Sequence, residues 1–334
     1  MVNLALKGFL EKNLQKTWKN SVLLNSKIAE RAVSALKLNI YNEATVLEMG
    51  PGPGIMTEAL LKRINPKLYI LMEPDKRFHP FLKAISEKTS SKVVLTELNG
   101  FLWSSYSQLE TQGLLKPGYQ PMDHIHTSLL FLAHLPHGVL GEQLLAQFLI
   151  ARYERLWIHQ YGRVRMLFWV TTSLARRLMA MPGKQGRCKL GIVRESVAEC
   201  KTIIGNKEFP GVCSELEATP KDFIREKDLI LIEIVPLSEI PIKAPLDSFD
   251  YVVRHLFVLR KTPLTKAIST LGPGAEVLTK KLPSYLLEKK VDEITREEFD
   301  EIGQVFDKWS FRPKILFDQW VNDKEECSNT IGGA

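Results

Sequence analysis

The amino-acid sequence predicts an α/β protein, with a largely parallel sheet over residues 1–262 and a small helical domain over residues 263–320. In the first part, short β-branched and apolar runs alternate with segments of helical periodicity, a pattern that favours a parallel sheet with helices on both faces. At Thr262-Pro263 the pattern becomes helical, because proline disfavours a continuing strand and often begins a helix. Residues 321–334 are polar, and we expect them to form a flexible tail.

The individual elements follow from these patterns. We predict strands near Thr45–Glu48, Leu68–Met72, Lys92–Thr96, Ser128–Ala133 and Val164–Val170, and the segments Lys201–Gly205 and Tyr251–Leu259 are predicted to complete the sheet. The predicted helices are Met56–Arg63, Pro74–Thr89, Gly138–Glu154 and Thr172–Met181, and in the C-terminal domain Leu278–Lys290 and Thr295–Trp309. The last of these begins with a capping box, in which Thr295 and Glu298 satisfy each other's free backbone N–H groups.

Composition excludes several classes of protein. The chain has 334 residues, 45% of them hydrophobic, which is enough for a substantial core. No apolar run approaches the roughly 20 residues needed to cross a bilayer, so we expect no membrane association. The four cysteines lack C-x-x-C spacing and histidine partners, so the sequence predicts no metal site and thiols in a reducing compartment.

The charge is unevenly distributed. Residues 1–262 carry a balance of +10 and residues 263–334 a balance of −3, within a net charge of +7. Residues 151–194 hold ten Lys or Arg and a single acid, Glu154. Such a local excess is typical of a nucleic-acid-binding surface, although a solvated helix face is the alternative.

The N-terminal segment is basic and amphipathic. Between Met1 and Ala29 there is one acid, Glu11, against five lysines, and apolar residues recur at helical spacing. A basic, acid-poor amphipathic helix fits a mitochondrial import signal. A first surface helix of the folded protein explains the same pattern.

A glycine-rich turn joins the first predicted strand to a helix, in the segment Glu48-Met49-Gly50-Pro51-Gly52-Pro53-Gly54. Glycines there let the backbone approach a ligand closely, and the helix end offers free N–H groups. The E-x-G-x-G-x-G pattern resembles the first motif of S-adenosylmethionine-dependent methyltransferases with the Rossmann-like class I fold. The resemblance implies cofactor binding by Glu48 and the three glycines Gly50, Gly52 and Gly54, by Glu73 at the ribose and by Asn99 at the adenine.

The motif that would perform catalysis is altered. Adenine N6-methyltransferases that resemble this chain carry Asn-Leu-Pro-(Tyr/Phe), in which the amide oxygen holds the target amino group and the ring stacks on the flipped base. Here the sequence reads His134-Leu135-Pro136-His137. Imidazole does not reproduce the amide geometry, so we expect no catalytic residue and S-adenosylmethionine bound, if at all, without turnover.

Two further blocks make the resemblance more specific. Arg176-Arg177-Leu178-Met179-Ala180-Met181-Pro182-Gly183, with the Arg187-Cys188-Lys189-Leu190 that follows, resembles the A-x-P-G-x-x-x-Y-x-R-L block of ribosomal RNA adenine N6-dimethyltransferases. The segment 250–264 resembles a divergent branch of that superfamily, the fungal mitochondrial transcription factor B proteins, which are specificity factors of the phage-type mitochondrial RNA polymerase. One departure weakens cofactor binding, because the family's Gln-Asn-Phe-Leu is Ser21-Val22-Leu23-Leu24 here.

This resemblance implies a transcription initiation factor in the mitochondrial matrix that binds the polymerase and promoter DNA, and we expect it to be a monomer with no required cofactor. Phe101 and Trp103 would stack on unpaired bases, with packing in the core as the alternative. DNA phosphates would be bound by a set of basic residues, Arg163, Arg165, Arg176, Arg177, Lys184, Arg187 and Lys189. The alternative function is an active mitochondrial rRNA adenine dimethyltransferase, and a third possibility is a protein that does both.

Overall fold

The computed structural model describes residues 4–13, 22–212, 217–224 and 228–314, which form two compact units. The first unit contains residues 1–179 and 193–240, and the second contains residues 180–192 and 241–334. Within the described residues no helix is long and apolar enough to cross a membrane. The predicted tail, residues 321–334, lies outside the described part of the chain.

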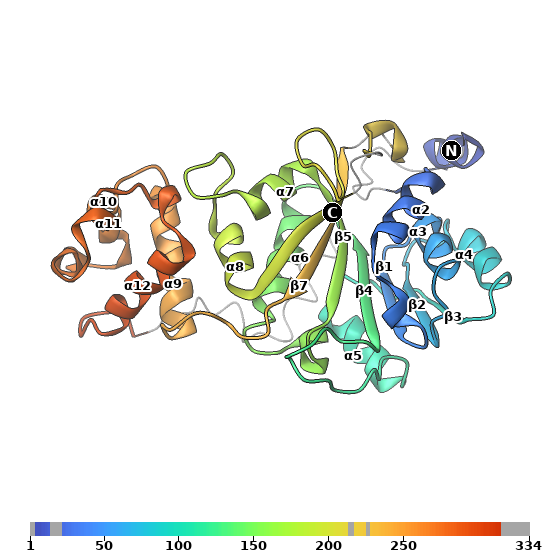
Figure 1. Cartoon of the computed structure of the whole chain (residues 1–334), viewed down its shortest axis with the longest axis horizontal. Coiled ribbons are helices and arrows are strands. Elements are labelled where there is room, and N and C mark those ends of the chain that lie inside the picture. Colours follow the sequence, from blue (N-terminus) through green and yellow to red (C-terminus); the bar gives the residue numbers. More distant parts are fainter. Residues whose placement is uncertain (1–3, 14–21, 213–216, 225–227, 315–334) are drawn as a thin grey trace. The chain divides into compact units, whose positions relative to one another are not determined.

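The first unit is built on one mixed sheet (Figure 1). Its seven described strands have the spatial order β3-β2-β1-β4-β5-β7-β6. Strands β1 to β5 are parallel, and β7 is antiparallel to both β5 and β6. The bounds are β1 Thr45–Met49, β2 Leu68–Met72, β3 Lys92–Thr96, β4 Leu129–His134, β5 Arg165–Thr171, β6 Ala198–Ile204 and β7 Leu229–Pro236.

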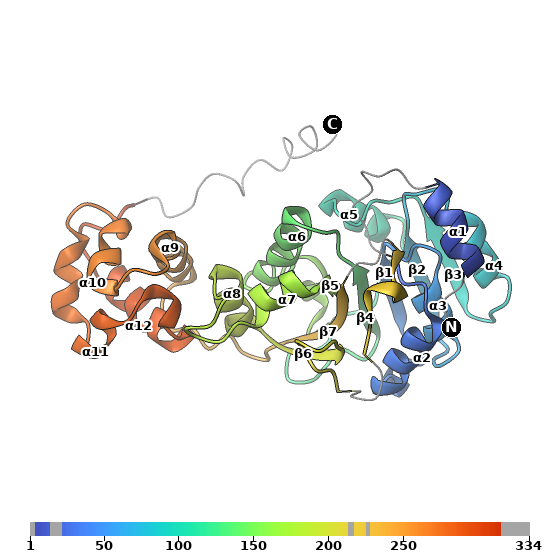
Figure 2. The ribbon, with the colours of Figure 1, turned by 90° about the horizontal axis from the view of Figure 1, so that it is seen from above.

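Helices cover both faces of this sheet. Figure 2 shows α2 and α3 on one side and α5 and α6 on the other. The helices of the first unit are α1 Leu4–Asn13, α2 Ser26–Ala35, α3 Ile55–Leu61, α4 His79–Ser86, α5 Trp103–Thr111, α6 Val139–Ile150 and α7 Thr172–Met179. Helix α8, Lys189–Val197, begins in the second unit and ends in the first.

The two faces of the sheet bury different side chains because successive residues of a strand point to opposite sides. Val46, Leu71 and Leu130 pack with apolar residues of α2, α3 and α4. On the other face, Phe131 contacts the indole of Trp157, with ring centroids 4.8 Å apart, and Trp157 stacks on Phe148 at 4.1 Å. This aromatic cluster fixes α6 against the sheet.

The second unit is helical in its described residues. It contains α9 Leu246–Leu256, α10 Leu264–Ala267, α11 Ser284–Glu288 and α12 Arg296–Asp307. Short 3-10 segments occur in both units, at Asn39–Tyr41, Trp157–Tyr161, Pro220–Asp222, Phe257–Leu259, Ile268–Leu271, Ala275–Lys281 and Val291–Glu293. The predicted capping box is confirmed: the side chain of Thr295 accepts from the N–H of Glu298, whose carboxylate accepts from the N–H of Thr295.

One prediction about the end of the sheet was wrong. The run Tyr251–Leu259, predicted as a strand, is the end of α9 followed by a 3-10 turn, because Phe249, Val252, Val253 and Leu256 form one buried helical face. The strand that completes the sheet beside β5 is instead β7. The boundary predicted at 262/263 differs from the one observed, since α9 belongs to the second unit and the first unit ends at residue 240.

A buried ion pair joins the last three strands. Glu233 on β7 is 3% exposed, and its carboxylate contacts both Arg165 on β5 and Lys201 on β6. Arg165 also donates to the backbone carbonyl of Lys37 at 3.2 Å. Removing one partner from a buried pair leaves an uncompensated charge, which destabilises more than the pair itself stabilises.

We therefore expect Glu233→Ala to lower the free energy of unfolding by about 3–5 kcal/mol, as measured by urea denaturation. Lys201→Ala, at a side chain that is 59% exposed, is the matched control and should cost no more than about 1 kcal/mol. Equal effects of the two variants would contradict a structural role for the buried Arg165 pair.

Candidate functional site

The glycine-rich turn is held by a buried carboxylate on β1. Glu48 is 2% exposed, and one of its oxygens accepts hydrogen bonds at 2.7 Å from both the Thr57 and the Tyr69 hydroxyls. Thr57 lies in the first turn of α3, and Tyr69 lies on β2. Glu48 was predicted to bind a cofactor, but the structure places it behind the turn, where it joins β1, β2 and α3.

A second carboxylate closes the turn from the side of β2. Glu73 is 5% exposed; Oε2 accepts from the backbone N–H of Gly52 at 3.0 Å, and Oε1 accepts from that of Asp75 at 2.9 Å. Burial raises the pKa of both Glu48 and Glu73 to about 7. Both carboxyl groups therefore titrate near neutral pH, which is unusual for Glu.

Glycine is required at two positions of the turn, because each has a positive φ and lies close to a neighbouring side chain. Gly54 has a φ of +80°, and a Cβ there would lie 2.5 Å from Ile85 Cδ1 of α4. Gly52 has a φ of +58°, and a Cβ there would lie 3.1 Å from Val22 Cγ2. Both conformations are ones that L side chains rarely adopt.

A small cavity lies at the carboxyl ends of β1, β2 and β4. It has a volume of about 30 Å³. Six predicted site residues line it, namely Gly50, Gly52, Glu73, Asn99, Phe101 and His134, together with Val22, Met49, Met72, Pro74, Phe78 and Gly100. The structure thus brings together the ends of the predicted cofactor motifs, but it leaves Glu48 and Gly54 outside the lining.

Segment Val22–Leu24 forms one wall of this cavity. Leu23 pairs with Phe223 in an antiparallel bridge, and the carbonyl of Val22 accepts from the N–H of Ile224 at 2.9 Å. These bonds hold the Val22 side chain against the glycine turn. Where the resembling enzymes carry a polar residue, this chain presents an isopropyl group to the cavity.

His134 lies at the end of β4 and faces the same cavity. It is 8% exposed, and neither ring nitrogen has a hydrogen-bond partner among the described residues. Burial lowers its pKa to about 4, so the imidazole is neutral at physiological pH. A neutral imidazole offers one donor and one acceptor, whereas the amide of Asn offers two of each.

The cavity is small in comparison with known sites for ligands the size of S-adenosylmethionine. Pockets for ligands of that size have volumes of roughly 300–1,000 Å³, whereas this cavity has space for about one water molecule. The Glu73 carboxylate is bonded to Gly52, and the amide oxygen of Asn99 accepts from the N–H of Phe101 at 3.0 Å. Both predicted cofactor ligands are therefore engaged within the protein.

Phe101 and Trp103 occupy different environments. Phe101 lines the cavity and is half-buried. Trp103, the first residue of α5, is 43% exposed, while one edge of its ring packs against Trp157 at 5.9 Å and Phe148 at 6.1 Å. Trp103 thus combines a packed edge with a solvent-accessible surface, and Tyr106 behind it is buried.

The predicted phosphate-binding residues separate into buried, paired and unpaired groups. Arg165 is 6% exposed and bonded to Glu233, and Arg187 is fully buried with Nη1 donating to the carbonyl of Ala180 at 2.9 Å. Both guanidinium groups are thus bonded within the protein and almost entirely removed from solvent, which leaves them little access to a phosphate.

The remaining members of that set lie at the surface. Arg176 pairs with Glu208 at 2.6 Å, Arg177 with Glu142 at 2.7 Å and Lys189 with Asp250 at 2.7 Å. Arg163 and Lys184 have no carboxylate partner among the described residues. The predicted basic surface is therefore largely neutralised by acids that are distant in the sequence.

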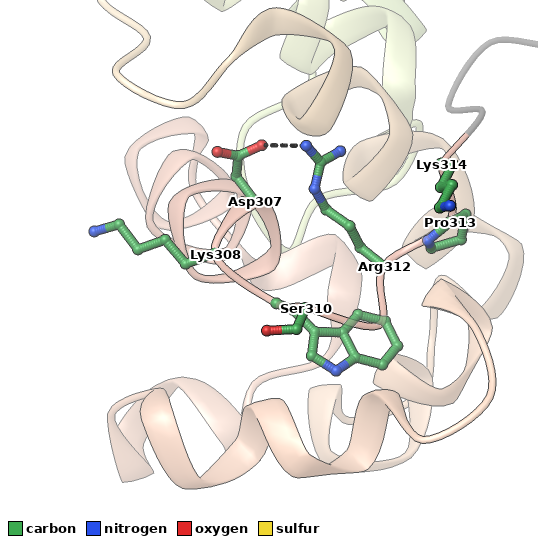
Figure 3. Close-up of a pocket in the computed structure, with 7 residues that line it drawn as sticks. Asp307, Lys308, Ser310, Arg312, Pro313 and Lys314 are labelled. Carbon is green, nitrogen blue, oxygen red and sulfur yellow. Dashed lines mark ion pairs between the residues drawn. The ribbon is translucent and has the colours of Figure 1, made fainter.

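A larger, open pocket of about 360 Å³ lies in the second unit (Figure 3). Arg312 pairs with Asp307 at 3.3 Å at its rim, and Lys308 points away from that pair. The pocket is lined by residues 307–310 and 312–314, next to the end of the described chain. No predicted site residue contributes to it.

Two sets of residues were missed in the sequence, one at this site and one elsewhere in the first unit. The hydroxyls of Thr57 and Tyr69 donate hydrogen bonds to Glu48. The only sequence signals for them are that Thr57 follows the glycine turn and that Tyr69 occupies an inward position of the next strand. Arg152 and Arg155 were counted among the basic residues but were not singled out, because their lack of acidic partners is visible only in the folded protein.

The strand order, the parallel β1–β5 sheet, the antiparallel β7 and the glycine turn define a Rossmann-like methyltransferase fold. Solved structures of this fold agree over most of the chain. The dimethyladenosine transferase of Plasmodium falciparum aligns with a TM-score of 0.60 at 15% identity, covering 86% of this chain and 98% of that one. The 23S rRNA methyltransferase ErmE aligns with a TM-score of 0.52 at 12% identity, covering 86% and 100%.

Sequence comparison gives the family. The model of the ribosomal RNA adenine dimethylase family matches residues 11–308, and the chain belongs to this family. It is 30% identical to mitochondrial transcription factor 1 of Lachancea kluyveri over 313 residues. This alignment covers 89% of this chain and 91% of that protein. It is also 30% identical to mitochondrial transcription factor 1 of Saccharomyces cerevisiae, covering 83% of each chain. The mitochondrial dimethyladenosine transferase 1 of Xenopus tropicalis is 27% identical, covering 78% of this chain and 69% of that protein.

The raised pKa of Glu48 predicts a specific dependence of stability on pH. Because the folded state binds the Glu48 proton more tightly than the unfolded state, this favourable contribution is complete below pH 4.5 and is lost as pH rises through about 7. Glu48→Gln cannot titrate, so its stability relative to the wild type should rise by up to about 3 kcal/mol between pH 5 and pH 8. Urea denaturation at both pH values measures this, and parallel pH profiles would show that Glu48 titrates normally.

Proposed function

We propose that this protein is a mitochondrial transcription initiation factor that associates with the phage-type mitochondrial RNA polymerase and promotes promoter recognition and melting without methyl transfer. The observation that carries the proposal is the site itself, where a neutral His134 stands at the position of the amide and the cavity at the predicted cofactor site has a volume of about 30 Å³. Its relatives named mitochondrial transcription factor 1 support the same function.

Capture of unpaired bases is the physical basis of this function. A protein that binds melted DNA better than duplex DNA shifts the equilibrium towards the open state, so no covalent step is needed. Trp103 presents part of its ring to solvent beside the half-buried Phe101. A base stacked on such a ring contributes about 1–3 kcal/mol. Acting as a monomer in the matrix, the factor would contact the polymerase, promoter phosphates and unpaired bases.

The second candidate is an S-adenosylmethionine-dependent adenine N6,N6-dimethyltransferase of the mitochondrial small-subunit rRNA. The intact glycine turn favours it, as do the relatives named mitochondrial dimethyladenosine transferases. Run-off transcription with the mitochondrial polymerase of the same organism, with and without this protein, tests the first function. Transfer of labelled methyl groups to a helix-loop RNA tests the second.

Trp103→Ala should leave binding to closed promoter DNA unchanged but reduce run-off yield at least fivefold, since stacking of a base on the indole contributes about 1–3 kcal/mol. A pre-melted template should restore the yield, and Trp103→Phe should retain most of it. Tyr119→Ala, which removes a 65% exposed ring elsewhere, is the control. A strongly lowered melting temperature without rescue by the pre-melted template would assign Trp103 to packing against Trp157 instead.

Transcription should not depend on S-adenosylmethionine. Run-off yield is expected to be the same with the cofactor omitted, and equilibrium dialysis should detect no binding to the wild type at millimolar concentration. Glu73→Gln, which keeps the volume of the side chain, should leave run-off yield unchanged while the protein remains folded. Saturable cofactor binding together with a yield that tracks cofactor occupancy would contradict this prediction.

A further inference from the structure

In the part of the basic segment 151–194 that belongs to the first unit, the charge left after ion pairing is concentrated at three arginines. Within this segment, Arg165, Arg176, Arg177, Lys189 and Arg194 each contact a carboxylate, and Arg187 is buried against a carbonyl. In the first unit, Arg152, Arg155 and Arg163 have no carboxylate partner among the described residues. They are the uncompensated cations of this segment on the sheet domain.

Two of these side chains are fixed at the end of β7. Arg152, just after α6, is 3% exposed, and its Nη2 donates to the carbonyls of Leu237 at 2.9 Å and Ser238 at 3.3 Å. Arg163 donates from Nε to the carbonyl of Pro236 at 2.5 Å. Backbone carbonyls therefore hold two guanidinium groups at neighbouring positions along the chain, which pre-organises them.

The three cations act on one another. Burial, followed by the charges of Arg155 and Arg163, lowers the pKa of Arg152. The Nε of Arg152 is buried and has no hydrogen-bond partner among the described residues. Arg155 is exposed, and Arg163 is half-buried. A buried guanidinium with two further cations nearby is unfavourable by itself, and an anion bound at Arg155 and Arg163 would relieve the repulsion.

We propose that Arg152, Arg155 and Arg163 form a binding site for the phosphodiester backbone of a nucleic acid. Guanidinium groups bind phosphate oxygens in a bidentate manner, and several arginines around one phosphate combine charge with directed donors. Arg155 and Arg163 would contact the phosphate. Arg152, which is buried and bonded to backbone carbonyls, would add its positive charge from beneath the protein surface. This inference rests on the DNA binding included in the proposed function and specifies where the backbone is held.

The site lies at the opposite end of the strands from the cavity. Arg163 precedes β5, whereas His134 pairs with Trp169 six residues further along that strand. At about 3.3 Å per residue this is a separation of roughly 20 Å along the strand direction. Binding here is therefore independent of the residues that line the cavity.

The test uses the full-length protein and a fluorescent random-sequence duplex, with anisotropy followed between roughly 50 and 200 mM salt. The double variant Arg155→Ala with Arg163→Ala should weaken binding at least about tenfold at the lower salt concentration. It should also reduce the slope of log K against log salt by about two, one for each arginine that no longer neutralises a phosphate. Replacing both residues by Lys should retain most of the slope.

The control removes two charges at exposed positions of α4 and its C-terminal end, on the opposite edge of the sheet, as Lys83→Ala with Lys88→Ala. It should leave the slope unchanged. A thermal melt with and without inorganic phosphate provides a second measurement: phosphate should raise the melting temperature of the wild type and not that of the double arginine variant.

Each other outcome overturns the proposal in a recognisable way. If the wild type binds DNA and the arginine variant behaves like the control, this site fails while the proposed function stands. If the wild type does not bind DNA, both fail. If the arginine variant binds DNA normally but no longer associates with the polymerase, the arginines bind an acidic protein segment instead.

Discussion

The hydrogen bonds that Glu48 and Glu73 make around the glycine turn are the constraint on which the site depends. Glu48 joins the turn to α3 and β2 through Thr57 and Tyr69, and Glu73 bonds directly to Gly52. Because these carboxylates are satisfied by the protein's own donors, the turn keeps its shape without a ligand. These bonds are sufficient to hold the glycine turn in its observed conformation.

The fold of the backbone and the side chains at the site lead to different expectations about function. The backbone positions of the methyltransferase fold are kept, whereas the group that would hold a target amine is a neutral imidazole with no hydrogen-bond partner among the described residues. This combination supports the proposed function, in which the fold serves binding. The partly exposed Trp103 is the first residue of α5, two residues after Phe101 of the cavity lining, so the residues proposed to stack on bases lie close to the cavity.

The charge of the folded surface also differs from the charge that the local sequence predicts. Ten basic residues and one acid in segment 151–194 predict a strongly cationic surface. In the structure Glu142, Glu208, Glu233 and Asp250, all outside that segment, neutralise four of the ten. Fewer residues are therefore left without an acidic partner than the sequence suggests, and two of them, Arg152 and Arg163, are bonded to backbone carbonyls at the end of β7.

The sequence by itself determined several of the local elements. β2 and β3 begin and end at the predicted residues, and the capping box at Thr295 is present, because strand periodicity and capping depend on neighbours in the chain. Tertiary structure decided what depends on distant partners. β7 was not recognised, and a strand was predicted at Tyr251–Leu259, because an apolar β-branched run is compatible with either element until its partners are known. The burial of Arg165 and Arg187, the placement of Glu48 behind the turn and the small volume of the cavity likewise arise from contacts between segments far apart in the sequence, which no local pattern encodes.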